Sequence, residues 1–97
     1  MIVKTKSGFT WDVNEERAKD WRFCKALAKC DSNDESTIIQ GITFVVPFLM
    51  GEDGEEALAE HVKDKQGIIP TEKIVSEFKE IITQLGAEAK KSKSSQD

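Results

Sequence analysis

The most apolar stretch of the chain lies near its middle, between strongly charged stretches. It covers Ile38–Met50 and reads IIQGITFVVPFLM. Apolar residues recur in it at the three- and four-residue spacing of a helix face: Ile38, Ile39, Ile42, Val45, Val46 and Leu49. The polar residues Gln40 and Thr43 fall off this face. The pattern favours a central helix, and a buried strand is the alternative because Val, Ile and Thr are also strand formers.

Flanking residues predict where this helix begins, bends and ends. Ser32 and Glu35 have the spacing of a capping box, in which each side chain satisfies a free amide of the first turn. Pro47 lacks a backbone N–H and clashes with the preceding turn, so we expect a kink immediately ahead of it. We expect the helix to end at Gly51.

The first thirteen residues have the pattern of a β-hairpin. Ile2–Thr5 and Phe9–Val13 are rich in β-branched and aromatic residues, and apolar and polar residues alternate in the second segment. The connection Lys6-Ser7-Gly8 suits a three-residue loop, since glycine adopts positive φ readily. An isolated hairpin is marginally stable in water, so this one must pack on helices.

A helix with a basic side is expected after the hairpin. Asp12 and Glu15 form a second capping-box pattern, which predicts a helix from about Asn14 to Lys29. Its core side is expected to carry Trp21, Cys24, Leu27 and Ala28, with Phe23 flanking them. The opposite side, here called the basic face, carries Lys19, Arg22, Lys25 and Lys29.

Two more helices are expected in the second half of the chain. Asp53 and Glu56 predict the start of a short helix that stops at Gly67, with Ala57, Leu58, His61 and Val62 on one face. Pro70 suits the entrance of a last helix, which runs from Thr71 to Leu85 and ends at Gly86. Its apolar face consists of Ile74, Val75, Phe78, Ile81, Ile82 and Leu85.

The expected fold is therefore a single small, mainly α domain of about four helices with an N-terminal β-hairpin. The domain covers residues 1–86. The remaining residues, 87–97, form an expected disordered tail, because the closing KKSKSSQD has no apolar residue.

Composition and charge narrow the classes of function. Of the 97 residues, 33% are charged and the net charge is −4, which argues against nucleic acid or an anionic membrane as partner. The central apolar run is shorter than the roughly 20 residues that span a bilayer. Cys24 and Cys30 stand about 9 Å apart along one expected helix, beyond disulfide reach, so we expect reduced thiols in a cytoplasmic protein.

Candidate chemistry centres on His61, the only histidine. A catalytic pair would need His61 with Cys24 or Cys30, and the alternative is a histidine at the rim of an apolar helix face. His61 with Glu60 and Asp64 has no repeated metal-ligand spacing. The acidic stretch 52–56 lacks the alternating ligands of a calcium loop. No glycine-rich phosphate loop is present, so we expect no catalytic, metal-binding or cofactor-binding residue, and no enzyme.

The central run carries apolar residues on nearly every side. Phe44, Phe48 and Met50 project away from the main apolar stripe of the run. Apolar surface on so many sides of one helix is difficult to cover in so small a domain. Either the other helices surround this segment, or part of it forms a patch for a partner or a second copy. The candidate partner-binding residues are Phe44, Phe48, Leu49 and Met50.

Several segments together resemble the small tail assembly chaperones of long-tailed bacteriophages and prophages. They are the opening TKSGFTWDV, the helix with Trp21, the segments LMGEDGEEALAEHVKDKQG and IIPTEKIVSEFKEII, and the Lys/Ser tail. The similarity covers roughly Lys4 to Leu85.

The resemblance implies a protein that binds the tape measure protein, keeps it soluble and recruits tail tube subunits before the tail polymerises. It implies no cofactor, a location in the cytoplasm of the bacterial host, and absence from the mature virion. Homo-oligomerisation stays open. The alternative function is a small regulatory protein that binds nucleic acid or an acidic partner through the basic face.

Overall fold

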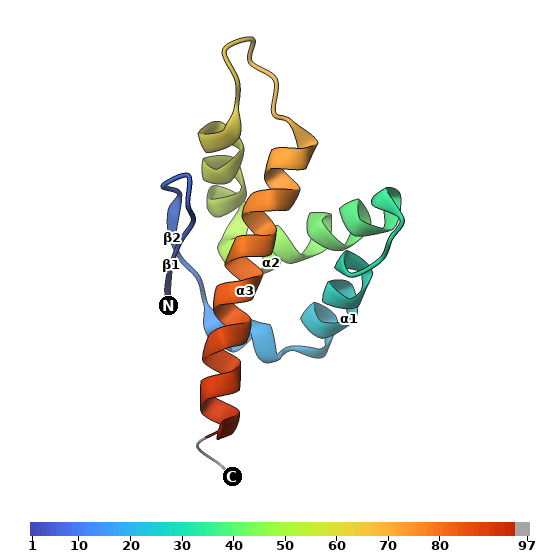
Figure 1. The fold of residues 1–97 in the computed structure, drawn as a ribbon, viewed down its shortest axis with the longest axis vertical. Helices are drawn as coiled ribbons and strands as arrows, with labels where there is room; N and C mark the ends of the chain where they lie inside the picture. The colour runs from blue at the N-terminus through green and yellow to red at the C-terminus, as the bar shows by residue number, and fades with distance from the viewer. Residues whose placement is uncertain (95–97) are drawn as a thin grey trace.

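The protein is a small, mainly helical domain with a two-stranded antiparallel hairpin at its N-terminus, as expected (Figure 1). The computed structural model describes residues 1–94, and side chains within residues 1–86. The elements are β1 (Ile2–Lys4), β2 (Thr10–Asp12), the 3-10 helix η1 (Glu15–Lys19), α1 (Trp21–Cys30), α2 (Glu35–Val62) and α3 (Thr71–Ser94). The described residues contain three α-helices, so the expected number of four is wrong.

The hairpin forms with the predicted loop and packs on the helices. Val3 pairs with Trp11 at the centre of the register, and Gly8 in the loop has a φ of 97°. Val3, Phe9 and Val13 are buried in the core. β1 is also tied to α3, because the Gln84 side chain donates to the Lys4 carbonyl at 2.7 Å and accepts from the Lys4 amide at 3.2 Å.

The helix expected from Asn14 to Lys29 is broken at Asp20. Asp20 has extended backbone angles, with φ −71° and ψ 137°, and its carboxylate accepts from the Arg22 amide at 2.7 Å. The break separates η1 from α1, and Asn14 caps η1 by accepting from the Glu16 amide at 3.1 Å. An aspartate that satisfies a free amide two residues later favours a new helix start over continuation.

This break changes which residues of α1 are buried. Phe23 and Ala26 lie in the core, whereas Trp21 is 73% exposed and Cys24 is exposed. The predicted core side was therefore wrong for Trp21, Cys24 and Ala28, which is also exposed, because it assumed one continuous helix. The basic face is confirmed as a solvent-facing surface, with all four of its residues exposed.

The second and third expected helices are joined in α2, which bends sharply at Gly51. Gly51 has φ 75° and ψ 171°, a backbone conformation essentially restricted to glycine. Residues 35–50, here called the first arm, and residues 52–62, the second arm, run in very different directions (Figure 1). The kink predicted ahead of Pro47 is thus wrong in position, since glycine tolerates a positive φ that other residues resist. The buried-strand alternative for the central run is also wrong.

The ends of α2 differ from the predictions as well. Its N-cap is Asp34, whose carboxylate accepts hydroxyl hydrogen bonds from Ser36 and Thr37, and the Ser32 hydroxyl accepts from the Asp34 amide instead of capping the helix. α2 ends at Val62, five residues before Gly67. The Asp64 carboxylate accepts two backbone amides and closes a turn there.

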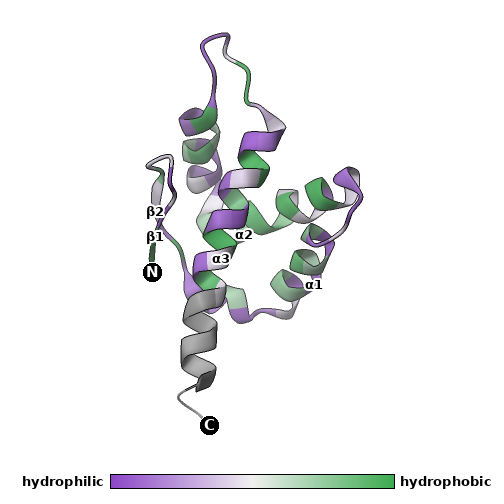
Figure 2. Ribbon diagram, viewed as in Figure 1, coloured by the Kyte–Doolittle hydropathy of each residue, from purple (hydrophilic) through white to green (hydrophobic). Residues whose placement is uncertain are grey.

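The core lies between the two arms of α2, the hairpin, α1 and α3. Figure 2 shows hydrophobic residues concentrated along the first arm and hydrophilic residues in the loop that follows α1. In α3, Phe78, Ile81 and Leu85 are buried and Ile74, Val75 and Ile82 half-buried, which confirms the predicted apolar face.

α3 continues past Gly86 to Ser94, beyond its expected end. The predicted disordered tail at 87–97 stays a prediction, because residues 95–97 lie outside the described residues, as do the side chains of 87–94. Among the described residues, no helix combines the length and hydrophobicity that crossing a membrane requires.

Candidate functional site

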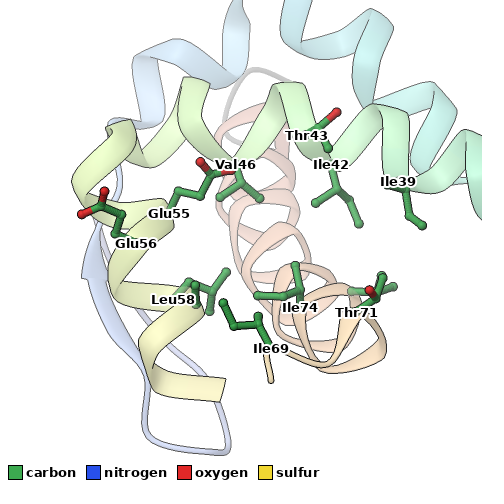
Figure 3. Close-up of a pocket in the computed structure, with 12 residues that line it drawn as sticks. Ile39, Ile42, Thr43, Val46, Glu55, Glu56, Leu58, Ile69, Thr71 and Ile74 are labelled. Atoms are coloured by element: carbon green, nitrogen blue, oxygen red, sulfur yellow. The ribbon is translucent and has the colours of Figure 1, made fainter. Parts of the chain in front are cut away.

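An open apolar groove lies inside the bend of α2. Its volume is about 390 Å³. Both arms of α2, the loop before α3 and the start of α3 contribute to it (Figure 3). The lining residues are Ile39, Ile42, Thr43, Val46, Glu55, Glu56, Leu58, Ala59, Ile69, Thr71, Ile74 and Val75.

The helix period and the Gly51 bend together bring these residues to one place. Ile39, Ile42 and Val46 stand at i, i+3 and i+7 in the first arm and so share one face. Figure 3 shows Ile42 and Val46 pointing toward Leu58 of the second arm and Ile74 of α3. Without the bend, the second arm would continue away from the first arm and could not form one side of the groove.

The groove has a buried floor and accessible walls. Leu58 is fully buried, and Ile42 and Val46 are almost fully buried. Ile39 and Ile74 are half-buried, and Ile69 is 45% exposed. A partner could therefore reach branched aliphatic side chains without unfolding the core.

Two carboxylates lie at one edge of this apolar surface. Glu55 and Glu56 follow the bend and are both exposed. Neither carboxylate takes part in an ion pair or hydrogen bond among the described side chains, so both are available to a cation. The groove thus offers apolar contact with negative charge beside it.

The predicted partner-binding residues do not lie in this groove. Leu49 and Met50 are buried in the core, with 3% and 6% exposed, so their assignment to an accessible patch is wrong. Met50 precedes the bend and packs close to Gly54 of the second arm, which covers it. Phe44 is 39% exposed and Phe48 half-buried, and their rings stack at 5.2 Å on a different face of the first arm.

His61 belongs to a polar network that fastens the hairpin loop to two helices. Its Nε2 lies 2.8 Å from the Ser7 hydroxyl, which donates to the Glu77 carboxylate at 2.7 Å. The buried Thr5 hydroxyl donates to the same carboxylate oxygen, also at 2.7 Å. Because the Ser7 hydroxyl donates its single proton to Glu77, its contact with His61 is a hydrogen bond when the imidazole carries its proton on Nε2 and donates to Ser7. A general base would accept from the nucleophile, so this arrangement is the reverse of a nucleophile and base.

The cysteines and acidic residues offer little chemistry within the described part of the chain. The Cys24 and Cys30 thiols lie near backbone carbonyls, those of Ala18 and Ala26. Burial, and secondarily the charge of Asp31, raise the pKa of the Cys30 thiol and so disfavour its reactive thiolate. No group of three or more His, Cys, Asp or Glu residues gathers in this part of the chain as a metal site would require.

Sequence reasoning missed the groove because it assigned Ile39, Ile42 and Ile74 to a closed core. A usable signal was present in Ile68-Ile69, two apolar residues outside any helical pattern. The position of Ile69 at one side of the accessible groove becomes apparent only once the bend of α2 at Gly51 is known. Comparison with models of protein families, with curated proteins and with solved structures gives no match for this chain.

Proposed function

We propose that this protein is a tail assembly chaperone of a long-tailed phage or prophage. It binds the tape measure protein, recruits tail tube subunits during tail assembly, works in the cytoplasm of the bacterial host and is left out of the mature virion. The observation that carries the proposal is the accessible apolar groove on a small, highly charged domain. The resemblance of its segments to those of tail assembly chaperones identifies the partners.

The shape of the groove suits a helical partner. Ile39, Ile42 and Val46 form a strip along one arm, faced by side chains of the second arm and α3. An amphipathic helix binds such a surface by placing apolar residues at i, i+3, i+4 and i+7 against it. A long helical protein that awaits assembly exposes such residues repeatedly, and covering them keeps it soluble.

The charge of the protein supports the same role. The net charge of −4 keeps the complex soluble after the apolar surface of the partner is covered. Glu55 and Glu56 favour partner segments with Lys or Arg beside the apolar residues. Recruitment of tube subunits needs a second surface, because an occupied groove is no longer available.

Co-expression with tape measure fragments from the same phage or prophage tests the proposal. We expect Ile69→Glu to reduce the captured fragment about tenfold, because a carboxylate in the groove must be desolvated without a partner. Ile68→Glu is the matched control: it adds the same charge at the neighbouring residue, which is 56% exposed and does not line the groove. Affinity purification and the soluble fraction of the fragment are the measurements.

The paired design separates binding from folding. Both isoleucines lie in the loop between α2 and α3, so both variants should keep the circular dichroism spectrum of the parent protein. Equal capture by the two variants would remove the groove from the proposal. Failure of the folded parent protein to bind any segment of the tape measure protein would reject the function itself.

A further inference from the structure

A second cleft lies between α1 and the first arm of α2. It has a volume of about 500 Å³. Its lining consists of Arg22, Lys25, Ala26 and Lys29 from α1 with Gln40 and Phe44 from α2. Three of these six residues are cationic and none of the six carries a carboxylate, in contrast to the acidic edge of the groove.

The packing of α1 on α2 forms this basic cleft. A Cβ atom at Gly41 would lie 2.7 Å from the Ala26 carbonyl oxygen, so the absence of a side chain lets the two backbones approach closely. Gln40 and Phe44, one turn apart, then flank this contact on the α2 side. Arg22, Lys25 and Lys29 share the facing side of α1 at i, i+3 and i+7. The four-residue basic face predicted from the sequence thus contributes three of its residues to a concave site.

The cations of the cleft differ in how far they are neutralised. Arg22 makes a two-point ion pair with Asp20, at 3.1 and 2.9 Å. Lys25 and Lys29 have no ion pair among the described side chains, and both are exposed. A partner's carboxylates would therefore gain the most electrostatic stabilisation by pairing with Lys25 and Lys29.

Accessible aromatic rings accompany these lysines. Phe44 stacks on Phe48, and the guanidinium carbons of Arg17 and Arg22 each lie 5.2 Å from the centre of the Phe48 ring. Trp21, 73% exposed, stands one helical turn before Lys25. Exposed aromatic and arginine side chains are enriched at protein interfaces and among the residues that dominate their affinity.

We propose that the basic cleft binds an acidic segment of a partner protein. Carboxylates of the segment pair with Lys25 and Lys29, and an apolar side chain between them packs on Phe44. Nucleic acid fits less well, because the chain as a whole carries −4, which repels a long polyanion. The inference rests on the α1–α2 cleft alone and holds whether or not the groove binds a tape measure protein.

The probe is a fluorescein-labelled peptide of glutamates with a central phenylalanine, measured by anisotropy against the whole chain. The charge-reversed double variant Lys25→Glu/Lys29→Glu should bind it at least about tenfold more weakly. The control Lys65→Glu/Lys73→Glu changes net charge equally at two exposed lysines outside the cleft, and should bind nearly as tightly as the parent. Phe44→Gln should weaken binding of this peptide but not of one that lacks the phenylalanine.

The outcomes distinguish binding of an acidic segment in the cleft from an effect of net charge and from binding of nucleic acid or lipid. Equal loss in both double variants would show that net charge, not the cleft, governs binding, and would overturn the proposal. Tighter binding of a single-stranded thymidine oligomer, or of vesicles of phosphatidylserine, than of the acidic peptide would also overturn it. The parent protein's failure to bind the peptide at low salt would do the same, whereas the Ile69→Glu protein should retain full binding, since its defect lies in the groove.

Discussion

The groove and the basic cleft occupy different faces of the same arm of α2, yet they differ in chemistry and in origin. The groove is aliphatic with carboxylates at its edge, and the cleft is cationic with aromatic rings. The groove depends on the backbone of Gly51, whose positive φ turns the second arm back. The cleft depends on the missing side chain of Gly41, which allows α1 to approach. One helix can therefore support two independent surfaces.

The separation of the two surfaces suits a protein with two partners. Ile39, Ile42 and Val46 point to one side of the first arm, and Gln40 and Phe44 point to another. Opposite charges at the two sites disfavour exchange of partners, because a segment that suits the lysines is repelled by Glu55 and Glu56. Variants that damage one site and spare the other test this independence.

The largest effect is expected from Gly41→Ala. The added Cβ would lie 2.7 Å from both the Ala26 carbonyl oxygen and the Cys30 sulfur, and the backbone oxygen cannot move without shifting α1. We expect the free energy of unfolding to fall by about 3 kcal/mol. Urea unfolding followed by circular dichroism measures this.

The fraction of the Gly41→Ala protein that stays folded should bind the acidic peptide more weakly. It should still bind tape measure fragments in the groove. Gly86→Ala is the control for the change of residue type. Gly86 lies within α3 with open space around it, so the alanine should raise the free energy of unfolding by about 0.5 kcal/mol. If the Gly41→Ala protein were as stable as the parent, the close approach of α1 to α2 could not be the cause of the cleft.

The hairpin and α3 could be predicted from the sequence because their signals are local. In Phe9–Val13, the alternation of apolar and polar residues specifies which side of the strand faces the core. In α3, the helical spacing of the apolar residues specifies which face packs on the core. The first helix could not, because Asp20 is equally compatible with a helix surface and with a helix cap. Only the hydrogen bond from the Arg22 amide shows which role it takes.

The groove could not be predicted because its shape depends on one pair of backbone angles. Gly51 was a reasonable helix end, but helical structure resumes at once in a new direction, and local sequence does not specify that direction. The burial of Met50 follows from the same bend. Its assignment to an accessible patch failed because the second arm covers it, and that contact is distant from the helical pattern of the first arm.

A smaller loss of stability is expected from Gly51→Ala. At φ 75° and ψ 171° a Cβ atom is strained whatever space surrounds it, which predicts a loss of about 2 kcal/mol in the free energy of unfolding. Relief of this strain would open the angle between the arms and widen the groove. Capture of tape measure fragments should fall, and affinity of the basic cleft for the acidic peptide should stay. Loss of both activities in folded protein would show that the two surfaces are coupled.

The smallest effect is expected from protonation of Asp20 in acid, at the start of α1. Hydrogen bonds from the Arg22 side chain, and then from its backbone amide, hold the pKa of the Asp20 carboxyl below its ordinary value of 3.8. A lowered pKa in the folded state stabilises the protein above pH 3.8, and this stabilisation is lost as the pH falls through the lower folded value. Protonation of Asp20 therefore weakens the cap of α1 and releases Arg22.

Asp20→Asn tests this, because asparagine caps a helix about as well but carries no charge. Urea midpoints measured across the acid range should fall less steeply for Asp20→Asn than for the parent, and the two curves should converge at the acid end. Arg22→Gln should flatten the curve in the same way, since it removes the main cause of the shift. Parallel curves for all three proteins would exclude this ion pair as a source of acid sensitivity.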